Sequence, residues 1–237
     1  MAYIDGFVVP VPLANKNAYL DMAKLGLPLF KEYGAVRVVE CWGDDVPEGK
    51  VTDFRRAVQA KPEETVVFSW IEWPSKAVRD AGQKKMIEDE RMTAIPGMPF
   101  DGQRMIYGGF APFAGPSGGG KAGYVDGAVI AVPAANKAAY RDRALAMAEV
   151  FKKHGATCVV DAWGDDVPEG KVTDFQRAVK VEDGETVVFS WIEWPSKAVR
   201  DVGWEELRAE PLMQPGGPTL FDGKRMIHGA FAPILDQ

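Results

Sequence analysis

Two hydrophobic patterns alternate along the first half of the chain. Stretches rich in β-branched and aromatic residues, most of them ended by proline or glycine, predict strands at residues 3–11, 36–42, 65–73 and 104–111. Apolar residues at helical spacing predict helices at residues 15–33 and 76–88. The resulting order, β-α-β-β-α-β, is the ferredoxin-like arrangement of an α+β fold, with both helices on one face of a four-stranded sheet.

Shorter signals lie between these elements. Ser75 can cap the second helix, because its hydroxyl can accept an unpaired amide of the first helical turn. A short apolar segment at residues 54–58 precedes the strand at residues 65–73, and we expect the two to pair antiparallel. The turn signal between such segments is clearest in the second half of the chain, where residues 182–184 read Glu-Asp-Gly.

The second half of the chain repeats the first without a gap. Gly127 follows Gly6, and Trp163 follows Trp42, by the same 121 positions. Between the copies, residues 115–123 read GPSGGGKAG, a composition typical of a flexible linker. We therefore expect a first repeat at residues 1–114, a linker at residues 115–123 and a second repeat at residues 124–237.

The two copies have diverged unevenly. Residues 42–54 recur unchanged as residues 163–175, and residues 64–80 recur unchanged as residues 185–201, whereas the stretches at 13–37 and 81–99 differ substantially from their counterparts. This unevenness indicates that the sequences of the two retained blocks are constrained. The constraint can come from packing of the fold or from a chemical role.

The predicted strands are apolar on both faces. In the strand at residues 65–73, Phe68 and Trp70 alternate with Val67 and Ile71. One face of the sheet is covered by the helices, so the other needs a second apolar surface. We expect the sheets of the two repeats to pack face to face as an intrachain pseudo-dimer.

Composition narrows the classes of partner. The chain has 46% hydrophobic and 26% charged residues, a net charge of -6 and no cluster of Lys and Arg, so nucleic acid is not an expected partner. No window approaches 18 apolar residues, which predicts a cytoplasmic protein without a membrane partner. Cys41 and Cys158 stand at non-equivalent positions of the two copies, so we expect buried, reduced thiols.

Candidate catalytic residues are few. Neither histidine is shared by the copies, because His154 matches Tyr33 and His228 matches Tyr107, so a histidine can act in one copy only. Glu72 and its match Glu193 are the catalytic candidates. Each would share a strand face with aromatic residues, and burial there would raise the pKa of the carboxyl group; at a solvated strand end it would have no such role.

Candidate ligand-binding residues combine an apolar wall with polar groups. Aromatic residues suit an apolar pocket, and arginines can hold a carboxylate, although core packing and structural ion pairs are the commoner uses of both. The candidates are Trp42, Arg56, Ser69, Trp70 and Arg104, with Trp163, Arg177, Ser190, Trp191 and Arg225 in the second copy. The loop at residues 42–50 gathers three carboxylates, but its spacing matches no standard metal site, and a solvated turn explains it. We expect no metal and no cofactor.

Four motifs together resemble the YbaA-like family of bacterial proteins, a domain of unknown function. They read YIDGFVVPVP, ECWGDDVPEGKVTDF, VVFSWIEWPSKAVRD and FDGKRMIHGAF, in the order and spacing of that family. The resemblance covers nearly all of both copies. It implies the dimeric α/β-barrel superfamily, in which two ferredoxin-like units close into one barrel and which includes cofactor-independent monooxygenases and isomerases, so the fold does not identify a reaction.

Two functional hypotheses remain. The first is a small-molecule-binding protein with pockets between sheet and helices in each copy, which could extend to a cofactor-independent enzyme of the monooxygenase or isomerase kind by superfamily analogy alone. The second is a non-catalytic binding or interaction protein whose retained motifs maintain the barrel interface. In both, the fused chain can exist as a monomer or as a homodimer.

Overall fold

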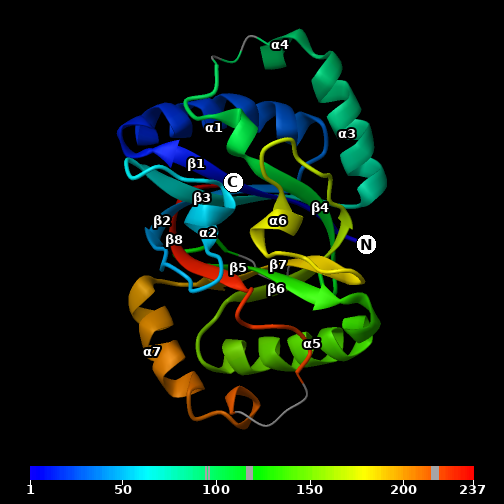
Figure 1. Cartoon of the computed structure of the whole chain (residues 1–237). Coiled ribbons are helices and arrows are strands. Elements are labelled where there is room, and N and C mark those ends of the chain that lie inside the picture. Colours follow the sequence, from blue (N-terminus) through cyan, green and yellow to red (C-terminus); the bar gives the residue numbers. More distant parts are fainter. Residues whose placement is uncertain (94, 96, 116–119, 215–218) are drawn as a thin grey trace.

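Eight antiparallel strands close into one barrel in the computed structural model, which describes all residues except 94, 96, 116–119 and 215–218 (Figure 1). The strands are β1 (Tyr3–Pro12), β2 (Arg37–Asp45), β3 (Glu64–Trp73), β4 (Ile106–Pro112), β5 (Tyr124–Pro133), β6 (Cys158–Asp166), β7 (Glu185–Trp194) and β8 (Ile227–Asp236). Their order around the barrel is β1-β3-β2-β8-β5-β7-β6-β4.

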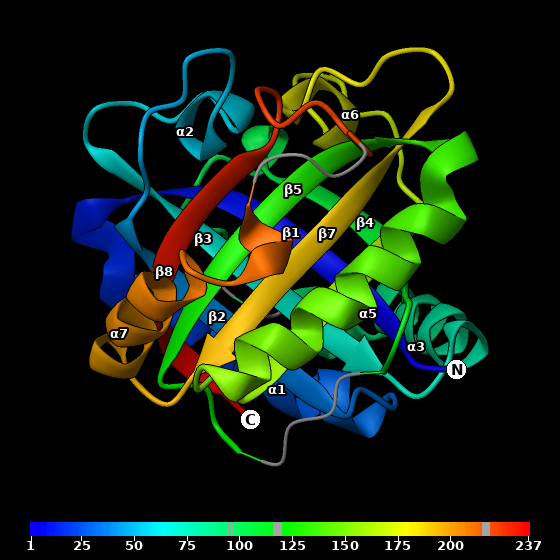
Figure 2. The same cartoon turned by 90° about the horizontal axis from the view of Figure 1, so that it is seen from below.

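Each repeat contributes four consecutive strands and two long helices. Within the repeats the strand orders are β2-β3-β1-β4 and β6-β7-β5-β8, and the two sheets are joined by the pairs β2–β8 and β4–β6. The long helices are α1 (Lys16–Glu32), α3 (Lys76–Glu88), α5 (Lys137–Lys153) and α7 (Lys197–Leu207). The first two cover one side of the barrel and the last two the opposite side (Figures 1 and 2). The predicted α+β fold, a pseudo-dimeric barrel of two ferredoxin-like repeats, is confirmed.

The remaining elements are short. They are the helices α2 (Phe54–Ala57), α4 (Glu90–Thr93) and α6 (Phe175–Ala178), and the 3-10 turns η1 (Leu13–Asn15), η2 (Gly102–Arg104), η3 (Ala134–Asn136) and η4 (Pro211–Met213). Ser75 caps α3 as expected, with its hydroxyl accepting from the Val78 amide. Of the expected linker at residues 115–123, residues 116–119 lie outside the described part of the chain, as do residues 94 and 96 of the divergent stretch, and the repeat boundaries stay a prediction.

The expectation that residues 54–58 pair with the following strand is wrong. Asp53 accepts a hydrogen bond from the Arg56 amide at 2.8 Å, which caps the helix α2 instead of allowing an extended segment. Phe54 and Val58 are fully buried in the cluster that fills the barrel. The antiparallel partners of β3 are β1 and β2, and the register with β2 pairs Trp42 with Val67.

Aromatic side chains from both repeats fill the barrel. Phe68 stacks on Phe189, with ring centroids 4.5 Å apart and an angle of 1° between the ring planes. The ring centroids of Trp70 and Trp191 are 4.6 Å apart. Gly6 lies directly against this stack, because a Cβ atom at that position would stand 2.9 Å from the Phe189 ring. The face-to-face contact expected of the two sheets is thus a packed interior.

The two retained sequence blocks meet across the boundary between the repeats. The Asp165 carboxylate in one block accepts from Tyr3 at 2.9 Å and pairs with Lys76 of the other repeat. The equivalent Asp44 accepts from Tyr124 and pairs with Lys197. These reciprocal contacts give a packing reason for the identity of the two blocks, which supports the interface hypothesis.

Candidate functional site

A cavity of about 550 Å³ lies between the sheet of the second repeat and the helices α5 and α7, and Asp45 and Pro47 of the first repeat also contribute to its lining. Side chains of Met147 and Phe151 on α5, Trp204 on α7, and Met213 on η4 contribute to its apolar lining. Its few polar residues include Tyr140, Asp161, Ser190, Arg143 and His228. The location between sheet and helices is the one expected from the sequence.

One row of residues crosses the strands on the helix-facing side of this sheet and lines the cavity. In the register of the strands, Ala128 on β5 pairs with His228 on β8 and with Ser190 on β7. Ser190 in turn pairs with Asp161 on β6. The row therefore reads His228, Ala128, Ser190, Asp161. The small side chain of Ala128 stands between the polar side chains of His228 and Ser190.

The matching row of the first repeat reads Tyr107, Phe7, Ser69, Glu40. Phe7 packs against two apolar clusters of the first repeat, whereas Ala128 offers a single methyl group. Ser69 is consequently 3% exposed, and its counterpart Ser190 remains partly accessible. The exchange of Phe7 for Ala128 between the copies opens the cavity.

The polar end of the row is a hydrogen-bonded group. The Tyr140 hydroxyl donates to Asp161 Oδ1 at 2.8 Å. Burial raises the pKa of the Asp161 carboxyl, against the effect of hydrogen bonds from Tyr140 and Ser190, which lowers it. Burial and the adjoining carboxylate also raise the pKa of Tyr140 well above its usual value. The group can donate or accept hydrogen bonds and can hold a proton.

Aromatic contacts fix the walls. The rings of Tyr140 and Phe221 pack edge to face with centroids 5.9 Å apart, and those of Phe151 and Trp204 do the same at 5.4 Å. Asp126 positions the second pair, because its Oδ2 atom accepts from Trp204 Nε1 at 2.8 Å while Oδ1 accepts from Arg200 at 2.7 Å. Arg200 is thereby engaged in an ion pair, and it supports the wall of the cavity.

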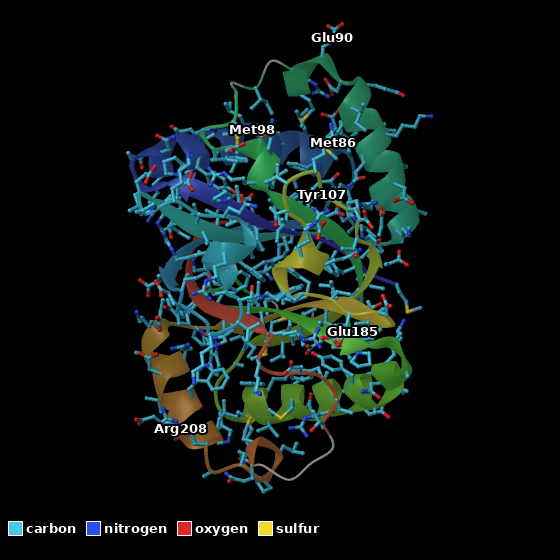
Figure 3. All side chains as sticks on the ribbon, in the orientation of Figure 1. Met86, Glu90, Met98, Tyr107, Glu185 and Arg208 are labelled. Carbon is cyan, nitrogen blue, oxygen red and sulfur yellow. The ribbon has the colours of Figure 1, made fainter. Side chains whose placement is uncertain are left out.

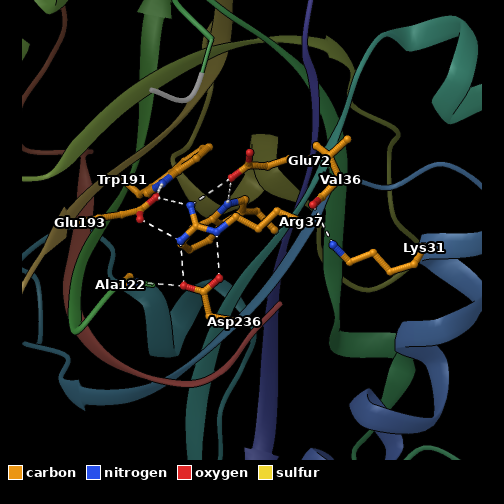
Figure 4. Close-up of polar contacts among 9 residues, drawn as sticks. Lys31, Val36, Arg37, Glu72, Ala122, Trp191, Glu193 and Asp236 are labelled. Carbon is orange, nitrogen blue, oxygen red and sulfur yellow. Dashed lines mark hydrogen bonds and ion pairs between the residues drawn. The ribbon is translucent and has the colours of Figure 1, made fainter. Parts of the chain in front are cut away.

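Four of the residues singled out in the sequence come together elsewhere, inside the barrel. Trp70 Nε1 donates to Glu72 Oε1, and Trp191 Nε1 donates to Glu193 Oε1, both at 3.0 Å. Arg37 lies between the two glutamates (Figure 4). The two catalytic candidates are therefore close to each other and to a cation that no sequence pattern predicts there.

Arg37 makes a fork of charged hydrogen bonds in this cluster. Its Nη1 and Nη2 atoms donate to Glu193 at 2.9 and 2.8 Å, and its Nε and Nη2 atoms donate to Asp236 at 2.8 Å each. Glu72 is more distant, at 3.4 Å from Nη1, and burial raises the pKa of its carboxyl. Asp236 also accepts from the Ala122 amide at 2.8 Å. The cluster thus ties both repeats to each other and to the segment in front of β5.

The other predicted ligand residues lie apart from both places. Trp42 and Trp163 are buried on the outer face of the sheets, each beneath a lysine ammonium of α1 or α5. Arg56 and Arg177 donate to the carbonyl groups of Gly49 and Gly170 and remain about half exposed.

Arg104 and Arg225 are held by structural ion pairs. Arg104 forms a two-pronged pair with Glu64 at 2.7 Å, and Arg225 does the same with Glu185. Each arginine also donates to a backbone carbonyl, that of Gln59 or Lys180. These contacts close the turn in front of β3 and β7. Of the predicted ligand-binding residues, Ser190 and Trp191 are among those that line the cavity, and the Trp191 indole nitrogen is bonded to Glu193.

Sequence reasoning missed Ala128, Tyr140 and Asp161. Two signals were present: the acids Glu40 and Asp161 interrupt apolar strands at matched positions, and Phe7 is exchanged for a much smaller residue. Among the described residues, no group of three or more His, Cys, Asp and Glu side chains could hold a metal ion. In the same part of the chain, no helix has the length and apolar character needed to cross a membrane.

Comparison with known sequences places the two halves in one family. The model of a "Protein of unknown function (DUF1428)" matches residues 2–102 and again residues 123–223. The uncharacterized protein YbaA of Escherichia coli K12 is 64% identical over 111 residues, which are 46% of this chain and 95% of that relative, and YbaA of Shigella flexneri matches equally well. The tandem duplication and the family resemblance predicted from the sequence are confirmed.

Comparison with solved structures shows the fold. A putative monooxygenase from Fusobacterium nucleatum has a TM-score of 0.58 at 8% identity, covering 100% of this chain and 94% of that one. A putative monooxygenase from Lactobacillus acidophilus has a TM-score of 0.55 at 9% identity, covering 100% and 96%. At such identity the likeness extends to the fold alone.

Proposed function

This chain belongs to the DUF1428 family of proteins of unknown function, and on that premise we propose that it binds one apolar small molecule in the cavity of its second repeat. The observation that carries the proposal is the exchange of Phe7 for Ala128, which opens space beside an otherwise buried polar group. The fold of the two repeats is the same, so this space is a local feature of one copy.

The character of the cavity supports the proposal. Small-molecule sites are mostly apolar concavities of roughly 300 to 1,000 Å³ with a small number of convergent polar groups. The cavity has about 550 Å³, aromatic and methionine walls, and the hydrogen-bonded pair of Tyr140 and Asp161. Arg143 and His228 stand among its lining residues as further polar groups.

The barrel interior is the less favourable place for a ligand. Glu72 and Glu193 are bound to indole groups and to Arg37, so their hydrogen-bonding capacity is used within the protein. We assign these two residues, the catalytic candidates of the sequence, to holding the repeats together. The retained motifs maintain the barrel interface in this proposal and also bring Ser190 to the cavity, while the divergent helix α5 supplies much of its apolar wall.

The reaction type, the cellular location and the assembly state stay predictions. Oxygenation or isomerisation without a cofactor stays a prediction for a molecule bound in the cavity, where Asp161 is the group placed to transfer a proton. A cytoplasmic location also stays a prediction, as does the choice between a monomer and a homodimer.

Replacing Ala128 by phenylalanine tests the proposal directly. The variant restores the residue of the first repeat and blocks the centre of the row that lines the cavity. We expect 2-naphthol, a flat uncharged probe, to bind the unmodified chain with one site in isothermal titration calorimetry, and to bind Ala128→Phe at least about tenfold more weakly.

The matched control is Ala128→Ser, which changes the same position with little added volume and should retain binding of the probe. Melting temperatures of both variants show that the barrel is intact. Undiminished one-site binding of 2-naphthol to Ala128→Phe would mean that the probe binds elsewhere, and would remove the cavity as the proposed site.

A further inference from the structure

We infer that the ligand of this cavity is a flat, uncharged molecule of about two fused rings with a hydroxyl-type polar atom at each end. It lies over Ala128, with one end at His228 and the other at Ser190 and Asp161. The inference rests on the proposed function, and it adds the chemical class of the ligand.

The spacing of the strands sets the length of the molecule. His228 and Ser190 flank Ala128 on the two neighbouring strands, and adjacent strands lie about 4.8 Å apart, so their Cα atoms are about 10 Å apart across β5. The methyl group of Ala128 leaves the middle of this span open. A molecule of two fused rings can bridge it, whereas a smaller one reaches a single end.

The walls favour flat rings. Trp204 and Phe151 form one aromatic pair, and Tyr140 and Phe221 form another, and all four residues line the cavity. Aromatic side chains gain from offset or edge contacts with another ring. Met147, at the matched position of Gly26, adds an adaptable surface that fits around a planar molecule.

The polar groups of the row favour an uncharged ligand with hydroxyl character. An anion at the Ser190 end would meet the carboxyl group of Asp161, whose pKa burial has raised because charge is unfavourable there. The guanidinium of Arg200 is already bound to Asp126 and Asp201, and Arg143, the other arginine of the lining, donates to the Leu212 carbonyl. Imidazole, hydroxyl and carboxyl groups can each donate or accept, which matches a hydroxyl group at either end.

The first repeat shows what the site requires. There Tyr107 replaces His228, Phe7 fills the middle of the row, and Tyr107 is 49% exposed on β4 (Figure 3). The chain therefore supplies its own matched positions, at which the same substitutions should have no effect on binding.

The experiment compares naphthalene-2,6-diol with 2-naphthol by calorimetry. We expect the diol, which has a hydroxyl group for each end, to bind roughly five- to tenfold more tightly than 2-naphthol. His228→Leu should abolish this advantage, so that the diol and 2-naphthol bind this variant with about equal affinity, and Tyr107→Leu should preserve it. A second variant, Ser190→Ala, should weaken both probes, with Ser69→Ala as its control.

A charged probe tests the remaining part of the inference. We expect 6-hydroxynaphthalene-2-carboxylate to bind more weakly than the diol, and tighter binding would overturn the uncharged class. Equal affinities of the diol and 2-naphthol, or an advantage that survives in His228→Leu, would overturn the two-ended ligand while leaving the cavity as a binding site. If neither probe binds, the proposed function falls together with the inference.

Discussion

Replacing Arg37 by methionine is expected to lower the free energy of unfolding by roughly 3 to 5 kcal/mol, because it removes the cation from a buried cluster of acids. Arg37 carries four of its hydrogen bonds to Glu193 and Asp236, whose side chains are 1% and 8% exposed. Without the guanidinium, these carboxylates would remain buried together with Glu72. Equilibrium unfolding in urea at pH 7 measures the loss.

Two comparisons separate this effect from the simple loss of an arginine. Arg141→Met removes an exposed pair on α5, whose side chains are 50% and 67% exposed, and should cost less than about 0.5 kcal/mol. In the triple variant that adds Glu193→Gln and Asp236→Asn to Arg37→Met, most of the stability should return, since two of the stranded charges are gone. A loss below about 1 kcal/mol in Arg37→Met would contradict a role of the cluster in joining the repeats.

The cluster depends on the fusion of the two halves. In a dimer of identical subunits, every residue near the symmetry axis occurs twice. Here Glu72 and Glu193 are matched, but Arg37 corresponds to Cys158, and Asp236 corresponds to Gly115. A single chain can therefore place one guanidinium between the two glutamates and supply one further acid from its C-terminal strand. The cavity follows the same logic, because Phe7 and Ala128 can differ only in a duplicated chain.

The fold could be predicted because each of its main determinants is local in sequence. The strand at Thr65 to Trp73 is recognisable from its β-branched and aromatic residues and from the proline that follows it. Because this strand is apolar on both faces, its second face requires a partner sheet. The constant offset between copies then supplies that partner. The segment at residues 54–58 was misjudged because its apolar residues suit either a strand or a helix, and the Asp53 cap decides for the helix.

The site could be predicted only in small part, because it depends on register. Ser190 was recognised, but its neighbours Asp161, Ala128 and His228 come from three other strands, and their alignment in one row follows from pairings that no local pattern specifies. Arg37 and Glu193 are likewise 156 positions apart. The cavity also depends on the absence of a large side chain at position 128, and an alanine does not by itself indicate a binding site.

The stability of the protein should fall as the pH rises from about 4.5 to 7, in part because of Glu40. Burial raises the pKa of this carboxyl from 4.5 to about 7, against hydrogen bonds from Tyr19 and Ser69. In that window the folded state holds a proton that the unfolded state has lost, so rising pH favours unfolding. A shift of this size corresponds to roughly 3 kcal/mol, present below pH 4.5 and lost above pH 7.

Glu40→Gln should remove this dependence, because the amide is uncharged at every pH and its oxygen can still accept from Tyr19, whose hydroxyl lies 2.7 Å from the carboxylate. We expect the free energy of unfolding of the variant to equal that of the unmodified chain near pH 4 and to exceed it by up to roughly 3 kcal/mol at pH 8. Other acids with raised pKa values, such as Asp5 and Glu72, are common to both proteins and cancel in the difference. Glu48→Gln, in an exposed loop, is the control and should show a constant difference across the same range. If the Glu40→Gln difference is also constant with pH, Glu40 is charged in the folded protein, and the polar end of the first-repeat row is solvated instead of buried.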